Sequence, residues 1–222
     1  IVPATIQFTD IGGLVEGAAK GEGLGNRFLA GIREVDAIVF VLRAFSDSDV
    51  PGPTDPVENL RIVEVELALA DLETTQKQLS KIEKAARADK SIGQILDSLK
   101  HASEQLDEGV PIYKSDLTSE ERELLSDFFL LTDKPVLAVV NMGEDQVEET
   151  NQILEPVIAE LSGQEVIGMC VQLESEAALL TPEEQAEMLE ALGLGEGALS
   201  KFVRSAYHLL GLRTFFTTGE KE

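Results

Sequence analysis

Two short and almost uninterrupted apolar runs constrain the fold most strongly. They are DAIVFVLRAF at residues 36–45 and PVLAVVN at residues 135–141. β-Branched and aromatic residues favour strands, and a run without alternating polar positions is typical of a parallel sheet covered on both faces. Two further strands are predicted at residues 1–8, where Pro3 interrupts the run, and at residues 165–171. The sequence therefore predicts a parallel sheet buried between helices.

Helix signals fill most of the chain between these runs. Residues 26–34 carry apolar side chains at helical spacing, and further helices are predicted at residues 146–161, 182–192 and 197–210. Strands that alternate with helices indicate an α/β fold, in which ligands bind at the carboxyl ends of the strands.

A long helical segment separates the two strongest strand runs. Its first helix is predicted from Pro56 to about residue 88, a turn follows at residues 88–91, and a second helix ends near Gly109. Leu72 and Leu79 lie seven residues apart, as in a coiled-coil hairpin. A third helix is predicted from residue 118 or 119 to about residue 131. We therefore expect a helical coiled-coil insertion at residues 60–132, within a domain formed by residues 1–59 and 133–222.

Polar motifs follow three of the predicted strands. They are Asp10-Ile11-Gly12-Gly13, Asn141-Met142-Gly143-Glu144, and the turn that begins at Cys170. The first motif opens a loop with six glycines between residues 12 and 25. Glycine at this density is expected where the backbone must move or approach a ligand closely. Because the ends of parallel strands meet at one edge of a sheet, the three motifs are predicted to form one site.

The order of these motifs resembles the third, fourth and fifth motifs of a P-loop GTPase-type domain. More closely, the whole chain resembles the YchF/Obg-like ATPase family of TRAFAC-type P-loop NTPases. The resemblance rests on ELALADL at residues 66–72, on the N-x-x-E form of the fourth motif, and on the second switch, FTDIGGLVEGAAKGEGLGNRFLAGIREVDAI. It implies a P-loop GTPase-like parallel sheet flanked by helices, with an inserted α-helical coiled-coil domain.

The resemblance assigns roles to three residues of the switch. Asp10 is expected to hold Mg²⁺ through a water, and the Gly13 backbone N–H to face the γ-phosphate. Leu14 occupies the position at which Ras-like enzymes carry a water-orienting glutamine, so hydrolysis must rely on another group and should be slow. Family members often carry a histidine in the loop that corresponds to residues 46–56, but this chain has none there.

The resemblance also implies how the base is bound. Asn141 is expected to hydrogen-bond the base N7, and Met142 to pack on the base face, unless it merely fills the loop. Glu144 stands where guanine-specific relatives have an aspartate, so ATP should bind at least as well as GTP. Backbone groups of Cys170, Val171 and Gln172 are expected to contact the base; Cys170 itself is expected to be a small buried residue.

Composition excludes some partners. The formal charge is −23 and the isoelectric point is about 4.3, which argues against broad binding to DNA or to an anionic membrane. The single cysteine, Cys170, allows no intrachain disulfide, which agrees with a reducing cytoplasm. No apolar run reaches the roughly 18 residues of a membrane span.

The sequence lacks the phosphate loop G-x-x-x-x-G-K-[ST]. The family resemblance places that loop upstream of residue 1 and a TGS domain beyond Glu222. We therefore expect a fragment of a ribosome-associated switch that uses Mg²⁺ and ATP or GTP, and expect this chain alone to be inactive. The alternative is a nucleotide-independent protein-interaction module that docks through an acidic helical arm between Glu73 and Glu108. A further alternative is that the arm is a solvated coiled coil without a partner.

Overall fold

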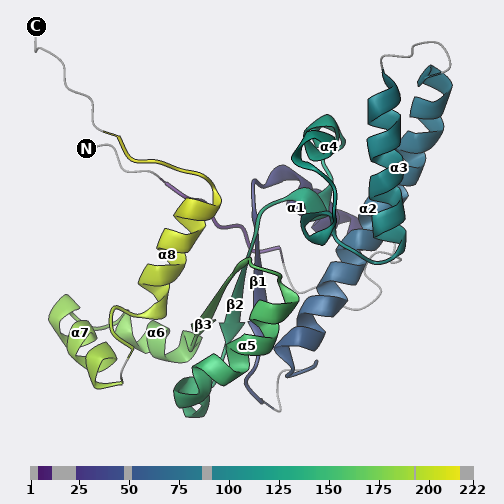
Figure 1. Cartoon of the computed structure of the whole chain (residues 1–222). Helices are drawn as coiled ribbons and strands as arrows, with labels where there is room; N and C mark the ends of the chain where they lie inside the picture. Colours follow the sequence, from purple (N-terminus) through teal and green to yellow (C-terminus); the bar gives the residue numbers. More distant parts are fainter. Residues whose placement is uncertain (1–4, 12–23, 48–51, 87–91, 193, 216–222) are drawn as a thin grey trace, which may run out of the picture.

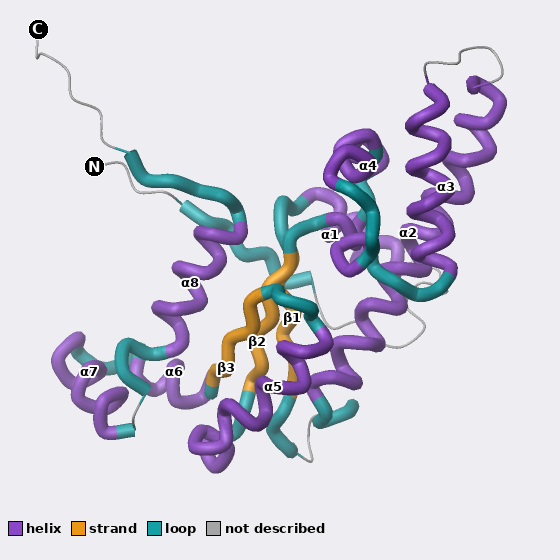
Figure 2. Tube along the Cα trace, in the orientation of Figure 1, coloured by secondary structure: helices purple, strands orange, loops and turns teal. Residues whose placement is uncertain are grey.

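A three-stranded parallel sheet lies at the centre of the protein. The computed structural model describes residues 5–11, 24–47, 52–86, 92–192 and 194–215. The strands are β1 (Ile38–Arg43), β2 (Val136–Asn141) and β3 (Glu165–Met169), in the spatial order β1-β2-β3. Ile38 is in register with Val136, and Leu137 with Glu165. Helices lie on both sides of the sheet, so the predicted α/β fold is confirmed (Figure 2).

Alternate side chains of the strands enter two different layers. Phe40, Leu42 and Val140 point into a core shared with helices α1 (Leu24–Glu34), α2 (Pro56–Ala86) and α5 (Thr150–Glu160). On the other face, α8 (Ala198–Leu209) packs against β2 and β3 (Figure 1). β2 is buried along nearly its whole length because it lies between two strands and under helices on both faces. This explains its unbroken apolar sequence.

The paired helices α2 and α3 (Gly93–Asp107) form an arm that extends away from the sheet (Figure 1). Its own core contains Ala68 and Leu99, packed with six other buried side chains and flanked by Leu72, Leu79 and Ile82. α2 also supplies Leu60 and Leu67 to the core beneath the sheet. One continuous helix therefore belongs to both cores, and the boundary at residue 60 stays a prediction.

The third helix of this region is shorter than predicted. α4 spans Ser119–Leu124, and Thr118 caps it by accepting a hydrogen bond from the Glu121 N–H. Phe129 then adopts a left-handed conformation with φ 51°, which no α-helix accommodates. Beyond it, the N–H groups of Leu131 and Thr132 donate to the buried Asp71 carboxylate at 2.8 and 2.7 Å. The distant carboxylate replaces helical carbonyls as their acceptor, so the prediction of a helix to residue 131 was wrong.

The predicted strand at residues 1–8 is also wrong within the described part of the chain. Residues 5–11 pair with none of the three described strands; residues 1–4 lie outside the description. The ring of Phe8 instead packs on Phe202 of α8, with 5.1 Å between centroids. A strand needs a neighbour for its backbone hydrogen bonds, and here the segment meets a helix.

The remaining elements complete the described chain. They are α6 (Val171–Ala177), α7 (Pro182–Ala191), and short 3₁₀ turns at Ile112–Lys114, Ser126–Phe128, Leu131–Asp133 and Glu144–Glu149. The predicted helix at residues 146–161 thus starts as a 3₁₀ turn and becomes α-helical at Thr150. Among the described residues, no helix is both long enough and apolar enough to cross a membrane.

His101 of α3 ties the arm to the segment that follows it. Its Nδ1 lies 2.9 Å from Glu121 Oε1, and its Nε2 lies 2.9 Å from Asp116 Oδ1. An imidazole with both nitrogens facing carboxylates is best satisfied when it is protonated, because both nitrogens then donate. The hydrogen bond to Glu121 is the main reason that the pKa of His101 is raised, and the same bond lowers the pKa of Glu121 to about 2.

We predict that His101→Gln lowers stability most between about pH 4.5 and pH 6.5, the ordinary pKa values of the two partners. Because the folded pKa of His101 is raised, the stability that His101 contributes is complete below pH 6.5. It is lost as the pH rises through the folded pKa. Because the folded pKa of Glu121 is lowered, the stability that its carboxylate contributes is lost as the pH falls from 4.5 toward 2. Urea unfolding at pH 5.5 and pH 8.5 measures the difference. His208→Gln, at an exposed position of α8, is the control, and an effect of His101→Gln that is equal at both pH values contradicts the prediction.

Candidate functional site

The carboxyl ends of the three strands bring two of the predicted motifs together. Arg43 is in register with Asn141, and Asn141 with Met169. The segment that begins at Asn141 and the segment that begins at Cys170 therefore leave neighbouring strands at the same edge of the sheet. This is the arrangement that the sequence predicted for these two motifs.

Asn141 connects the ends of all three strands. Its backbone C=O accepts a hydrogen bond from the Ala44 N–H at 2.8 Å, just past β1. Its side-chain Oδ1 accepts from the Val171 N–H at 3.2 Å, at the start of α6. The side chain is only half-buried, so it is held by one neighbouring segment while it remains accessible at the sheet edge.

Gly143–Gln146 forms a closed turn directly after Asn141. The Gln146 N–H donates to the Gly143 C=O at 3.1 Å, and the Gly143 N–H donates to Gln146 Oε1 at 2.8 Å. The Gln146 amide also donates from Nε2 to the Ala44 C=O at 3.0 Å. Glu144 and Asp145 lie between these fixed points, and both side chains are exposed. The turn therefore presents two carboxylates at the strand ends.

The predicted turn after β3 is a helix. Cys170 is buried, as expected of a small apolar residue, and α6 begins at the next residue. Val171 and Gln172 lie exposed in its first turn. The buried carboxylate of Glu174 accepts a hydrogen bond from the Ala198 N–H at the start of α8. This bond fixes α6 against α8. The chain enters a helix directly after Cys170, where a turn was expected.

Met142 is a core residue and does not face the sheet edge. Its side chain is 4% exposed and belongs to the core beneath the sheet. It packs below Gly168, where an added Cβ would lie 2.9 Å from the Met142 Cε and 2.9 Å from the Thr150 Cγ2. The predicted packing of Met142 on a base face is therefore contradicted, because a base cannot reach a side chain that the sheet and α5 cover.

Asp10 follows irregular chain, not the end of a strand. It is exposed, and its neighbour Ile11 packs against the core beside Gly31 of α1. Gly13 and Leu14 lie outside the described residues. Within the described ranges, no three His, Cys, Asp or Glu side chains are arranged to hold a metal ion. The predicted role of Asp10 in holding Mg²⁺ through a water requires only one carboxylate.

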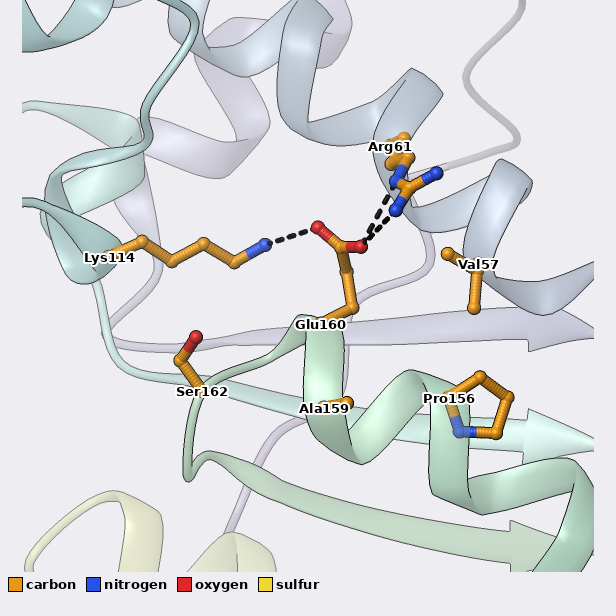
Figure 3. A pocket seen from close by; sticks show the side chains of 7 residues that line it. All are labelled: Val57, Arg61, Lys114, Pro156, Ala159, Glu160 and Ser162. Carbon is orange, nitrogen blue, oxygen red and sulfur yellow. Dashed lines mark hydrogen bonds and ion pairs between the residues drawn. The ribbon is translucent and has the colours of Figure 1, made fainter.

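A shallow hollow of about 510 Å³ lies away from this edge (Figure 3). Glu160, at the carboxyl end of α5, accepts from Arg61 at 3.0 and 2.6 Å and from Lys114 at 3.4 Å. Lys114 is also paired with the buried Glu64, which accepts a hydrogen bond from Tyr113. The two cations therefore already have carboxylate partners, so the hollow has no excess charge with which to attract a phosphate.

Comparisons with known proteins agree with the motifs at the strand ends. No protein-family model matches the chain. Over its full length the chain is 41% identical to the ribosome-binding ATPase YchF of Bacillus subtilis and 39% identical to that of Escherichia coli O157:H7. The resemblance to the YchF/Obg-like ATPases is confirmed. Over 99% of the chain, an Obg-like ATPase homolog of Schizosaccharomyces pombe is 37% identical.

A solved structure agrees with this conclusion. The Schizosaccharomyces pombe YchF GTPase superposes on 90% of the chain with a TM-score of 0.74 and 32% identity. The chain spans 63% and 62% of the two bacterial relatives, 55% of the S. pombe homolog and 57% of the solved chain. The similarity therefore covers this whole chain but only part of each relative.

Sequence reasoning missed Gln146, which closes the turn that carries Glu144. Its position three residues after Gly143 is a recognisable signal, since a Glu or Gln at the third position of a helical turn often reaches back to the N–H before it. The second bond of Gln146 goes to Ala44, 102 residues away in sequence, and only the fold reveals it.

We predict that Met142→Ala lowers the free energy of unfolding by about 2–4 kcal/mol, because it leaves a cavity under Gly168. Chemical denaturation measures this loss. Met188→Ala on α7, where the side chain is half-buried, is the control and should cost less. If Met142→Ala left stability unchanged but weakened nucleotide binding in the full-length protein, the side chain would be acting on the base and not in the core.

Proposed function

We propose that this chain supplies the base-recognition and switch segments of a slow, Mg²⁺-dependent ATPase that acts on the ribosome. The observation that carries the proposal is the turn at Asn141–Glu144, which is fixed at the carboxyl edge of a parallel sheet beside the start of α6. Ligands in parallel α/β folds bind at this edge. The relatives named above are ribosome-binding ATPases, which supports the same reaction.

The proposed base contacts use the accessible groups of this edge. Asn141 would bind the base N7 through its side-chain amide, while its Oδ1 stays held by the Val171 N–H. Val171 and Gln172 would supply contacts from the first turn of α6. The carboxylate of Glu144 is one methylene longer than the aspartate that suits guanine, which favours ATP over GTP.

The switch residues complete the proposed mechanism. Mg²⁺ would supply charge compensation at the phosphates, and Asp10 would hold a water of its hydration shell. The Gly13 N–H would face the γ-phosphate without an intervening side chain. Leu14 cannot hydrogen-bond an attacking water, so turnover would be slow and would depend on another group.

We also propose that the arm contacts the ribosome, which places the protein in the cytoplasm. The arm is less acidic than expected: residues 73–108 contain six Lys or Arg and seven Asp or Glu, in a chain of charge −23. Lys77, Lys81 and Lys84 are exposed on one face of α2, at spacings of four and three residues, and Lys77 is already paired with Glu73 at 2.6 Å. A basic face suits the phosphates of ribosomal RNA. We further propose that the full-length protein contains a TGS domain.

The alternative is a protein-interaction module that acts through the arm without nucleotide. Both hypotheses use the arm, so they differ only in whether the strand-end site binds nucleotide. Calorimetric titration of the full-length protein with ATP and with GTP, each with Mg²⁺, separates them. If neither nucleotide binds, the ATPase proposal is wrong and the alternative stands.

For the base contact, we predict that Glu144→Asp in the full-length protein raises GTP affinity relative to ATP by roughly threefold to tenfold, because the shorter carboxylate restores the fit to guanine. Calorimetry with each nucleotide measures the ratio. Asp145→Glu, at the neighbouring exposed carboxylate, is the control. An unchanged ratio would show that Glu144 does not read the base.

For the metal, we predict that Asp10→Ala weakens ATP binding in the presence of Mg²⁺ roughly tenfold more than in its absence, because a charge-assisted hydrogen bond to a metal-bound water is lost. Titrations with Mg²⁺ and with EDTA make the comparison. Asp36→Ala, at an exposed carboxylate before β1, is the control. Equal losses under both conditions would contradict the proposed role.

For the partner, we predict that Lys81→Glu combined with Lys84→Glu weakens ribosome co-sedimentation of the full-length protein and reduces its salt dependence, because phosphate contacts are lost. Lys201→Glu, at an exposed position of α8, is the single-site control. Binding that is unaffected by the double substitution would remove this face of α2 from the proposed ribosome contact.

A further inference from the structure

The side-chain amide of Gln146 joins two loops at the candidate site. Its Oε1 accepts from the Gly143 N–H at 2.8 Å, which is an ordinary capping bond at the start of a helical turn. Its Nε2 donates to the Ala44 C=O at 3.0 Å, in the segment that follows β1. The second bond is not part of a cap. It connects the turn after β2 to a different strand end.

The segment after β1 is itself firmly held. The Ala44 N–H donates to the Asn141 C=O at 2.8 Å. The Arg43 Nε donates to the Phe45 C=O at 2.9 Å, and the guanidinium lies over the Phe45 ring at 5.0 Å from its centroid. Gly143 faces the same residue, since an added Cβ would lie 3.7 Å from the Phe45 Cβ. Ala44 therefore provides a fixed acceptor for the Gln146 amide.

Asn141 and Gln146 hold the two ends of the segment that contains Glu144. Asn141 fixes the start of the segment through β2 and the Val171 N–H, and Gln146 fixes its end. Glu144 lies between them as the first residue of the 3₁₀ turn Glu144–Glu149, and its side chain is exposed. The distance between the Asn141 amide and the Glu144 carboxylate, which would contact different atoms of one base, depends on how firmly Gln146 closes the turn.

We propose that Gln146 is a positioning residue for base recognition, and that its amide sets the place of Glu144 relative to Asn141 by bridging Gly143 and Ala44. This inference rests on the proposed nucleotide-binding function and adds a residue that sets base preference without touching the base.

The test compares Gln146→Met with Gln146→Glu in the full-length protein. Methionine keeps the size of the side chain and removes both hydrogen bonds. Glutamate keeps an acceptor for the Gly143 N–H but cannot donate to the Ala44 C=O, so it preserves the cap and removes the bridge. Gln152→Met, at an exposed position on α5, is the matched control. Affinities for ATP, GTP and inorganic tripolyphosphate are measured by calorimetry, together with the melting temperature.

We expect Gln146→Met to weaken ATP binding by roughly tenfold, and to lower the ratio of ATP affinity to GTP affinity by roughly threefold. The affinities of Gln146→Glu should lie between those of Gln146→Met and those of the wild type. Affinity for tripolyphosphate, which has no base, should be unchanged in all variants. Gln152→Met should match the wild type throughout.

Other outcomes separate the inference from the function on which it rests. If the wild type binds no nucleotide, the proposed function fails. If the wild type binds ATP but Gln146→Glu behaves like the wild type, the bridge to Ala44 is irrelevant and the inference is overturned while the function stands. An equal loss of ATP and tripolyphosphate affinity in Gln146→Met also overturns it, because the residue would then only support the fold.

Discussion

The buried carboxylate of Asp71 is the interaction on which the junction of arm and sheet depends. It is 1% exposed and accepts hydrogen bonds from the Leu131 N–H, the Thr132 N–H and the Thr132 hydroxyl. The same hydroxyl oxygen accepts from the Ile112 N–H at 3.1 Å. Burial raises the pKa of Asp71, and the bonds to Thr132 and Leu131 oppose that rise. A buried carboxylate is costly unless its lone pairs are satisfied, and here three donors of Leu131 and Thr132, distant in sequence, satisfy them.

The same interaction shows why the fold was only partly predictable. β2 and most helices could be predicted because local patterns of apolar residues determine them. The end of α4 could not, because the N–H groups of Leu131 and Thr132, which the longer predicted helix would approach, bind a side chain 60 and 61 residues earlier in the sequence. The segment at residues 5–8 has the composition of a strand, but composition does not reveal whether a neighbouring strand is present. In each case a partner far away in sequence decided the local structure.

The candidate site shows a similar division. The positions of Asn141, Glu144 and Cys170 after buried strands were sufficient to predict two adjoining motifs at one edge of the sheet. Sequence alone could not distinguish a methionine that covers a base from one that fills the core, because both are apolar and both follow Asn141. Met142 fills the core because Gly168 has no side chain and leaves space under β3 for the methionine. That space depends on the register of β2 and β3.

The position of Asp71 within α2 has a mechanical consequence. The helix continues from Asp71 for fifteen further residues to Ala86, a length of roughly 22 Å at 1.5 Å per residue. A tilt of roughly 10° about this point would move the end of the helix by about 4 Å, more than the length of a hydrogen bond. The arm would therefore pivot at the buried carboxylate of Asp71. Small rearrangements at the junction with the sheet would be amplified into large displacements of its tip.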